Sequence, residues 1–153
     1  MTFLENRIPP PIVALLCGAV MVFIAGGLPA LDAMARGQVV AAVAIALAGL
    51  AICLAGVVSF RRAKTTVNPL RPETASSLVG TGIYRVTRNP MYLGFALCLA
   101  GWTVWLGSLP ALAGVALFVL YIDRLQIVPE ERALKALFGE EYAGYCARVR
   151  RWV

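Results

Sequence analysis

Long stretches without a charged residue set the hydrophobic pattern of this chain. They extend over residues 8–31, 37–60 and 89–122. A helix needs about 20 apolar residues to cross a hydrocarbon core of roughly 30 Å, so each of the first two stretches fits one membrane span. The third stretch is long enough for two spans, and its residues 106–110, Leu-Gly-Ser-Leu-Pro, are typical of the turn between two helices.

The pattern therefore predicts an all-α membrane protein with about four transmembrane helices, in which residues 1–153 form one integral-membrane domain. The expected spans are residues 12–31, 39–60, 91–106 and 110–128. The last two are short enough to need a thinned bilayer or support at the interface. A signal peptide is the alternative for the first apolar run, but that run is long for such a segment.

The polar segments complete the prediction of the fold. Residues 61–89 hold two prolines and two glycines, which favours an irregular, re-entrant-like loop. Asn89 and Pro90 are suited to cap and begin the third span. In the tail, residues 129–153, apolar side chains recur at near-helical spacing between charged ones, which predicts a C-terminal amphipathic helix broken at Gly139.

Basic residues are distributed unevenly between the polar segments. The loop between the second and third spans contains Arg61, Arg62, Lys64, Arg71, Arg85 and Arg88, whereas the loop after the first span has only Arg36. The positive-inside rule then predicts that both termini and the middle loop are cytoplasmic, in the inner or plasma membrane of a prokaryote. This bias and attraction to anionic membrane lipids explain the net charge of +6, so no nucleic-acid partner is inferred.

The absence of histidine excludes several classes of membrane enzyme. Without it, the chain cannot provide an imidazole general base, a histidine-containing di-iron cluster or a histidine-ligated haem. The four cysteines also lack the close spacing of a metal site or a disulfide framework. We therefore predict no metal site.

Three short motifs concentrate polar chemistry on the predicted cytoplasmic side. They are Gly-Thr-Gly at 80–82, Arg-Asn-Pro-Met-Tyr-Leu-Gly at 88–94 and Glu-Glu-Arg at 130–132. Each is a weak signal alone, but the predicted topology brings all three to one membrane face. Asp123 and Arg124 are expected near the same face, where either snorkelling or the lining of a pocket would explain them.

In this order, with Glu141 and Tyr142 after them, the motifs resemble those of the integral-membrane methyltransferases, which include phospholipid N-methyltransferases and isoprenylcysteine carboxyl methyltransferases. The resemblance covers about residues 66–152. It implies that the three motifs together enclose the cofactor S-adenosylmethionine. Many relatives carry histidine at the position of Asn89, so a titrating base is absent there and carboxyl methylation is not transferred directly.

The resemblance also implies transfer of a methyl group to a lipid-like or apolar acceptor that arrives through the bilayer. Phospholipid amines and isoprenylcysteine-type carboxylates are the first candidates, and small thiols follow. Two other classes remain open: a compact four-helix transporter and a non-enzymatic membrane scaffold. A transporter would need an ionisable residue near mid-membrane, and no carboxylate lies deep in a predicted span. Partners beyond the acceptor and membrane lipids are not indicated, and the oligomeric state is left open.

The residue types in the motifs suit the chemistry of that cofactor. A glutamate can bind its ammonium group or ribose hydroxyls, Arg88 can hold its carboxylate through two parallel hydrogen bonds, and glycine lets the backbone approach closely. The ring of Tyr92 could cover the adenosine or the sulfonium, with Gly94 leaving room beside it. The catalytic candidates are Arg88, Glu131 and Tyr92. The cofactor-binding candidates are Gly80, Gly82, Tyr84, Arg88, Asn89, Pro90, Tyr92, Gly94, Glu130, Glu131 and Tyr142.

Overall fold

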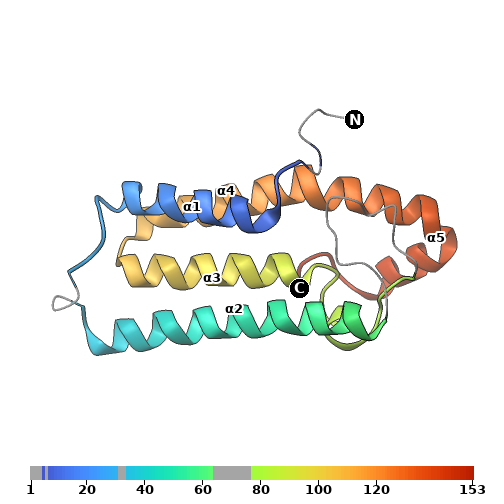
Figure 1. Ribbon diagram of the computed structural model, residues 1–153, viewed down its shortest axis with the longest axis horizontal. Helices are drawn as coiled ribbons and strands as arrows, with labels where there is room; N and C mark the ends of the chain where they lie inside the picture. Colours follow the sequence, from blue (N-terminus) through green and yellow to red (C-terminus); the bar gives the residue numbers. More distant parts are fainter. Residues whose placement is uncertain (1–4, 6, 31–33, 64–76) are drawn as a thin grey trace.

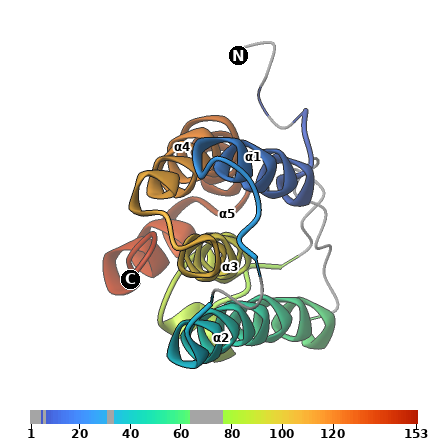
Figure 2. The same cartoon turned by 90° about the vertical axis from the view of Figure 1, so that its left-hand side faces the viewer.

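A computed structural model describes residues 5, 7–30, 34–63 and 77–153, and all regular structure in them is helical. Three layers are visible when the molecule is seen from the side and from its end (Figures 1 and 2). The helix α3 occupies the middle layer, α1 and α4 lie together on one side of it, and α2 lies on the other. Their bounds are α1 Pro10–Ile24, α2 Arg36–Arg62, α3 Pro90–Leu106 and α4 Leu112–Ile122.

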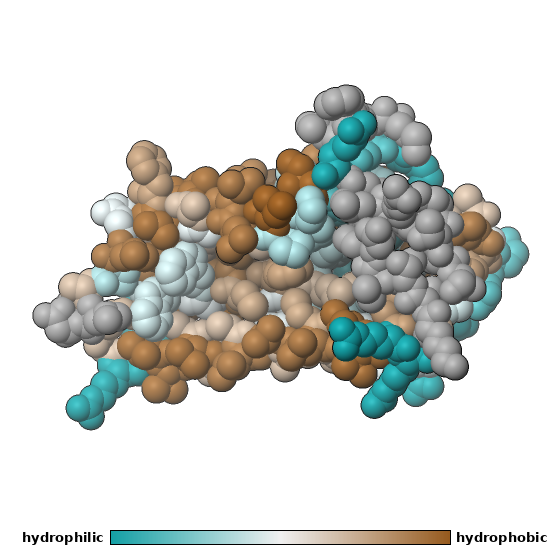
Figure 3. Space-filling view, in the orientation of Figure 1, coloured by the Kyte–Doolittle hydropathy of each residue, from teal (hydrophilic) through white to brown (hydrophobic). Residues whose placement is uncertain are grey.

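The outer surface of the bundle is apolar. Large hydrophobic side chains point outward from α1, α2 and α4; Phe23 is 88% exposed, Leu15 74% and Val40 67%. In the space-filling view apolar residues cover much of the visible face over the helices, and strongly hydrophilic residues lie beside the grey atoms and at the opposite end (Figure 3). An exposed apolar area of this kind requires an apolar surrounding. The chain is therefore a membrane protein.

Two helical segments are long and apolar enough to cross a membrane. They are α2, with 27 residues, and the continuous helical run Leu109–Arg148, with 40. The helices α1 and α3 are also apolar but have only 15 and 17 residues.

Small residues let α2 and α3 approach closely. A Cβ atom added to Gly49 of α2 would lie 2.6 Å from the carbonyl oxygen of Gly94 in α3, and one added to Gly101 would lie 2.8 Å from the carbonyl oxygen of Ala42. Small residues at such contacts are typical of helix packing in membranes, where backbone approach replaces the hydrophobic effect as the source of attraction. The packing of α2 against α3 therefore depends on these glycines.

The ends of α1 and α3 follow from backbone glycines. The helix α1 ends at Ile24, well before the expected residue 31, because Gly26 and Gly27 adopt positive φ values of 79° and 124°. The helix α3 begins at Pro90 and ends at Leu106, which confirms the helix predicted over 91–106. Gly107, with φ of 61°, closes α3 in the left-handed conformation.

The helical run after α3 continues past the point where the sequence predicted the end of the fourth span. A short 3-10 turn, η4 (Leu109–Ala111), leads into α4, a π-helical segment, η5 (Asp123–Ile127), follows α4, and α5 (Val128–Arg148) begins at once. The helix therefore continues through residue 128 into the tail, for which the sequence predicted a further helix. Pro129 ends no helix there, because the wider π-helical turn before it accommodates a residue that cannot donate a backbone hydrogen bond.

The break predicted at Gly139 is confirmed. Gly139 adopts φ 46° and ψ −119° inside α5, and the second half of α5 turns back toward the end of the bundle (Figure 1). Before α3, residues 77–89 are irregular apart from a 3-10 turn, η3 (Gly82–Arg85), as the sequence predicted for this loop. The part of the predicted loop over residues 64–76 lies outside the described residues.

Candidate functional site

One end of the bundle brings together the three polar motifs. The end of α2, the segment before α3, both halves of α5 and the C-terminal residues all lie at this end (Figure 1). The loop between α3 and α4 lies at the opposite end. The gathering of the motifs on one side, which the sequence predicted from topology, is confirmed.

A network of ion pairs joins the second and third motifs. Nη2 of Arg88 lies 2.9 Å from Oε1 of Glu131, and Arg151 donates to both oxygens of the same carboxylate, at 3.0 Å from Nε and 2.6 Å from Nη2. Arg151 also reaches Asp123, with 3.1 Å between Nη1 and Oδ1. Paired hydrogen bonds between a guanidinium and a carboxylate are strong and directional, so these four partly buried side chains fix one another.

This network answers the question that the sequence left open for Asp123 and Arg124. Asp123 is an ion-pair partner of Arg151, whereas the Arg124 side chain is exposed. Asp123 therefore belongs to the polar end of the site, and Arg124 does not.

Glu130 lies apart from this network and pairs with Tyr92. The hydroxyl of Tyr92 donates to Oε2 of Glu130 over 3.1 Å, although the two residues are 38 positions apart. Glu130 lies beyond the apolar part of its helix, and burial raises the pKa of its carboxyl to about 7, with Glu131 adding to the rise and the Tyr92 hydrogen bond opposing it. The carboxyl can therefore gain or lose a proton near neutral pH.

The C-terminal residues hold the segment before α3. The backbone N–H of Arg88 donates to the carbonyl of Arg150 at 3.0 Å, and the carbonyl of Arg151 accepts from Nδ2 of Asn89 at 2.9 Å and from Oγ1 of Thr87 at 3.3 Å. The side chain of Asn89 was expected to cap α3, but it forms no capping bond. Its amide is instead used to hold the C-terminal segment.

Two glycines and two tyrosines shape the approach to α3. Gly82 has φ of 61°, and a Cβ atom there would lie 2.8 Å from Oγ of Ser59, so the turn packs tightly on α2. The ring of Tyr84 meets Phe60 edge-to-face with 5.3 Å between centroids, and its carbonyl accepts a 2.8 Å hydrogen bond from the hydroxyl of Tyr145. Burial raises the pKa of Tyr145 to about 12, so this hydroxyl keeps its proton and acts as a donor.

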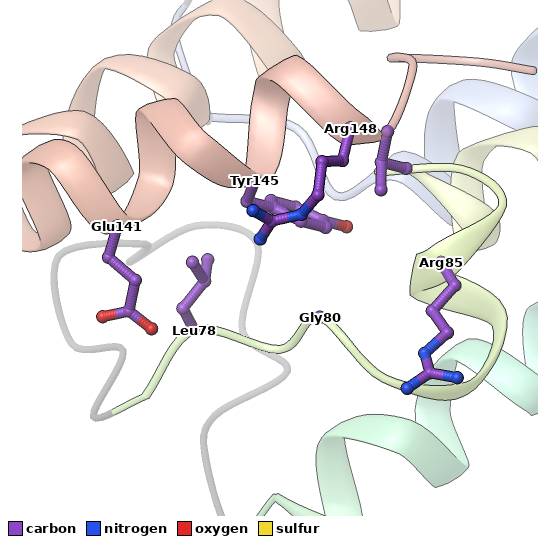
Figure 4. A pocket seen from close by; sticks show the side chains of 7 residues that line it. Leu78, Gly80, Arg85, Glu141, Tyr145 and Arg148 are labelled. Atoms are coloured by element: carbon purple, nitrogen blue, oxygen red, sulfur yellow. The ribbon is translucent and has the colours of Figure 1, made fainter.

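A pocket of about 410 Å³ lies between the second half of α5 and the segment around Gly80 (Figure 4). Its lining residues are Leu78, Gly80, Arg85, Glu141, Tyr145, Arg148 and Val149. This volume is within the range of small-molecule sites. Gly80 is the one expected cofactor residue in the lining, and the charged lining residues were not among the candidates.

Three other candidates lie away from this pocket. Gly94 faces α2, where its role is close helix packing, and Pro90 also contacts α2, because a Cβ atom on Gly56 would lie 3.2 Å from its Cγ. Tyr142 is buried beside Tyr145, with 6.3 Å between ring centroids, in a small apolar cluster. None of these three residues lines the pocket, and neither do the remaining candidates apart from Gly80.

Sequence reasoning missed Arg151. The sequence does not single it out among the basic residues of the tail. No local pattern separates Arg151 from Arg150, which is exposed, and the distinction depends on partners 20 and 28 positions away. Thr87 was missed for the same reason.

Comparison with known proteins decides the family. Residues 37–141 match the model of the phospholipid methyltransferase family, which is more than half of the chain. The chain belongs to the phospholipid methyltransferase family. The chain is 31% identical over 93 residues to protein-S-isoprenylcysteine O-methyltransferase B of Arabidopsis thaliana, covering 61% of this chain and 47% of that protein.

Two further relatives extend this comparison. A probable protein-S-isoprenylcysteine O-methyltransferase of Oryza sativa subsp. indica is also 31% identical over 93 residues, which is 61% of this chain and 49% of the relative. An uncharacterized protein of Haemophilus influenzae is 48% identical over 63 residues, covering 41% of this chain and all of the relative. This chain spans about half the length of the two plant relatives. No solved structure matches the chain.

Proposed function

We propose that this protein transfers a methyl group from S-adenosylmethionine to a lipid-like or apolar acceptor at the cytoplasmic membrane interface. Membership of the phospholipid methyltransferase family and similarity to proteins named isoprenylcysteine O-methyltransferases support methyl transfer. The observation that carries the proposal is the Arg88–Glu131 pair, because it joins two distant motifs at the polar end of an apolar bundle.

The residues at this end fit the cofactor chemically. Nε of Arg88 is buried and has no hydrogen-bond partner among the described residues, so it can donate to an oxygen of a bound molecule. The backbone at Gly80 lies in the pocket wall without a side chain in the way. When bound, the cofactor supplies an electrophilic methyl group on a sulfonium sulfur.

The contributions of the chain are binding, orientation and exclusion of water. In our proposal, Arg88 and Glu131 bind the cofactor's polar groups. Tyr92 positions the Glu130 carboxyl through the hydrogen bond from its hydroxyl. The buried rings of Tyr84 and Tyr145 limit water at the pocket. Methyl transfer needs alignment of acceptor, methyl and sulfur more than it needs a covalent role for the protein, so a rigid polar end suits it.

The proposed setting in the membrane is a four-span topology. In it α1, α2, α3 and the α4 part of the long helical run cross the bilayer, and the polar end is cytoplasmic. The two shorter helices would span with local thinning of the bilayer. The acceptor, a phospholipid amine or an isoprenylcysteine-type carboxylate, would then reach the site from the lipid side.

Calorimetric titration of the purified protein with S-adenosylmethionine and S-adenosylhomocysteine tests the proposal. We expect Arg88→Ala and Glu131→Ala each to weaken binding by about 30-fold, because each removes a charged group that the proposal places on the cofactor. Exposed residues provide the matched controls, Glu140→Ala for the glutamate and Arg124→Ala for the arginine. Absence of binding by the wild-type protein would overturn the proposal.

A second measurement addresses the acceptor. Transfer of a labelled methyl group into a total lipid extract, followed by separation of the labelled lipids, is expected to give a labelled lipid product. Label confined to small thiols in a mixed extract would contradict a lipid acceptor while leaving cofactor use intact.

A further inference from the structure

Two buried polar atoms at the π-helical segment η5 have no hydrogen-bond partner. They are Oη of Tyr121 and Oε1 of Gln126, and among the described residues one further side-chain atom shares this property, Nε of Arg88. The proposed function uses Arg88 but neither of the other two residues. An unsatisfied polar atom in the interior lowers stability, and polar groups inside a membrane protein commonly serve a function. Both atoms are therefore candidates for contact with a ligand.

The amide of Gln126 is held in one orientation. Gln126 is fully buried, and its Nε2 donates a 2.9 Å hydrogen bond to the carbonyl of Ile8, 118 positions earlier in the chain. A carbonyl can only accept, so the nitrogen faces Ile8 and Oε1 points away from it. Oε1 is thus a fixed hydrogen-bond acceptor, whereas the hydroxyl of Tyr121 can donate or accept. Of the two, Gln126 is the residue that can discriminate between ligands.

Gln126 lies on the bundle side of the polar groups that the proposed function assigns to the cofactor. It belongs to η5, four residues before Glu130 and five before Glu131 in α5, a distance of about 6 Å along a helix axis. Residues four apart share one helix face, so Gln126 and Glu130 face the same side. Glu130 pairs there with Tyr92, and Glu131 pairs with Arg88. An acceptor that arrives from the lipid would therefore meet Gln126 between the apolar bundle and the cofactor.

We propose that Gln126 binds the methyl acceptor and selects an amine, an inference that rests on the proposed function. The N–H of a neutral amine donates to Oε1 of Gln126. A carboxylate would instead place a negatively charged acceptor oxygen against it, and a thiol is only a weak donor. Burial of the site favours the neutral amine over the ammonium form, which releases its proton to water before binding.

The hydrogen bond to Gln126 becomes stronger during the transfer. The nitrogen lone pair forms a bond to the methyl carbon while the carbon–sulfur bond breaks, so the sulfonium becomes a neutral thioether and the positive charge passes to nitrogen. An N–H on a positively charged nitrogen is a stronger donor, so Oε1 stabilises the transition state more than the bound amine. A primary amine has two N–H groups, its monomethyl form has one and its dimethyl form has none. Gln126 therefore assists the first and second methylations but not a third.

Short-chain phosphatidylethanolamine and its N-methyl and N,N-dimethyl forms provide the test. In labelled-methyl transfer we expect Gln126→Met to lower kcat/KM by about 10-fold for the first two acceptors and to leave the slower transfer to the dimethyl form unchanged. Gln126→Glu keeps an acceptor oxygen and should retain the preference of the wild type. Gln38→Met is the matched control, because Gln38 also donates to distant backbone carbonyls, those of Val104 and Trp105, but at the opposite end of the bundle. It should not change the relative rates of the three acceptors.

The outcomes separate this role of Gln126 from the proposed function. Equal loss for all three acceptors, or no loss for any, overturns the selection of an amine and leaves Gln126 a structural residue. Thermal unfolding in detergent identifies a variant that has lost its fold. Transfer by the wild type to a farnesylcysteine carboxylate but to none of the amines also overturns it, while methyl transfer itself stands. If the wild type binds neither S-adenosylmethionine nor S-adenosylhomocysteine, the proposed function itself fails.

Discussion

The body of α3 and its beginning are held in different ways. Along most of its length, α3 contacts α2 through glycines that bring two backbones together, as at Gly49 and Gly94. At its beginning, α3 is held by charged and amide groups, including Arg88, Asn89 and Arg151. Close packing tolerates no added atoms, whereas the polar end keeps groups that a ligand can engage. We therefore expect mutations in the bundle to affect stability first and mutations at the polar end to affect binding first.

The largest effect is expected in the bundle. Gly49→Val would place side-chain atoms against the carbonyl of Gly94, and backbone cannot move aside as a flexible side chain does. We expect the free energy of unfolding to fall by about 3 kcal/mol, measured by thermal or chemical unfolding in detergent. Gly37→Val is the control, because a Cβ atom there meets nothing within 4 Å. Equal stability of the two variants would show that α2 and α3 do not need this close approach.

Removing the charge of Arg151 should separate binding from stability. Arg151→Gln loses the two hydrogen bonds to Glu131 and the ion pair with Asp123 but keeps the backbone carbonyl that holds Asn89. Calorimetric affinity for S-adenosylhomocysteine is expected to fall about 30-fold, with a change in unfolding temperature of only a few degrees. A variant that binds normally would place Arg151 outside the functional network.

The pKa of Glu130 predicts a pH dependence of stability at the polar end. Because this pKa is raised to about 7, the folded state holds a proton that the unfolded state has already released, and stability falls as the pH rises from about 4.5 to 7. Glu130→Gln retains an acceptor for Tyr92 and removes the titration. Relative to the wild type, this variant should gain about 2 kcal/mol or less between pH 5 and pH 8 in unfolding experiments. A constant difference between the two proteins across this range would contradict the assignment.

The smallest effect concerns the break in α5. Gly139→Ala meets no neighbouring atom within 4 Å, so its cost comes from the positive φ alone and should be about 1 kcal/mol. Gly144→Ala, in the helical second half of α5, should be neutral or slightly stabilising. Comparison of unfolding temperatures tests the pair. If Gly139→Ala is the more stable variant, the turn does not depend on the positive φ of Gly139.

Local signals in the sequence were sufficient for several elements. Pro90 begins α3, Gly107 ends it and Gly139 breaks α5, and each is a backbone preference of a single residue. The predicted end of α1 was wrong. Apolar residues continue past Gly26, and the prediction followed the apolar run rather than the tendency of two glycines to end a helix. The π-helical segment η5, which joins α4 directly to α5, was not predicted.

Less of the site was predictable, because its contacts join distant positions. A glycine at position 94 is compatible with space for a ligand or with close packing of a neighbouring helix. The choice depends on Gly49 of α2, which lies against Gly94 in the structure. The contacts of Arg151 with Asp123 and Glu131 depend on where α5 turns back, which the spacing of charges does not determine. Gathering of the motifs was predictable, since topology alone places them on one side.

The π-helical segment η5 also determines which way the glutamates face. Such a segment contains one residue more than the α-helical turn it replaces, so every side chain after it is rotated by about 100° around the helix axis. This change of phase lets one continuous helix direct Leu117 and Leu120 outward while Glu130 pairs with Tyr92 inside. The outward-facing apolar part of the helix and its polar part are thus two separate registers, and the five residues Asp123–Ile127 are the point at which one is exchanged for the other.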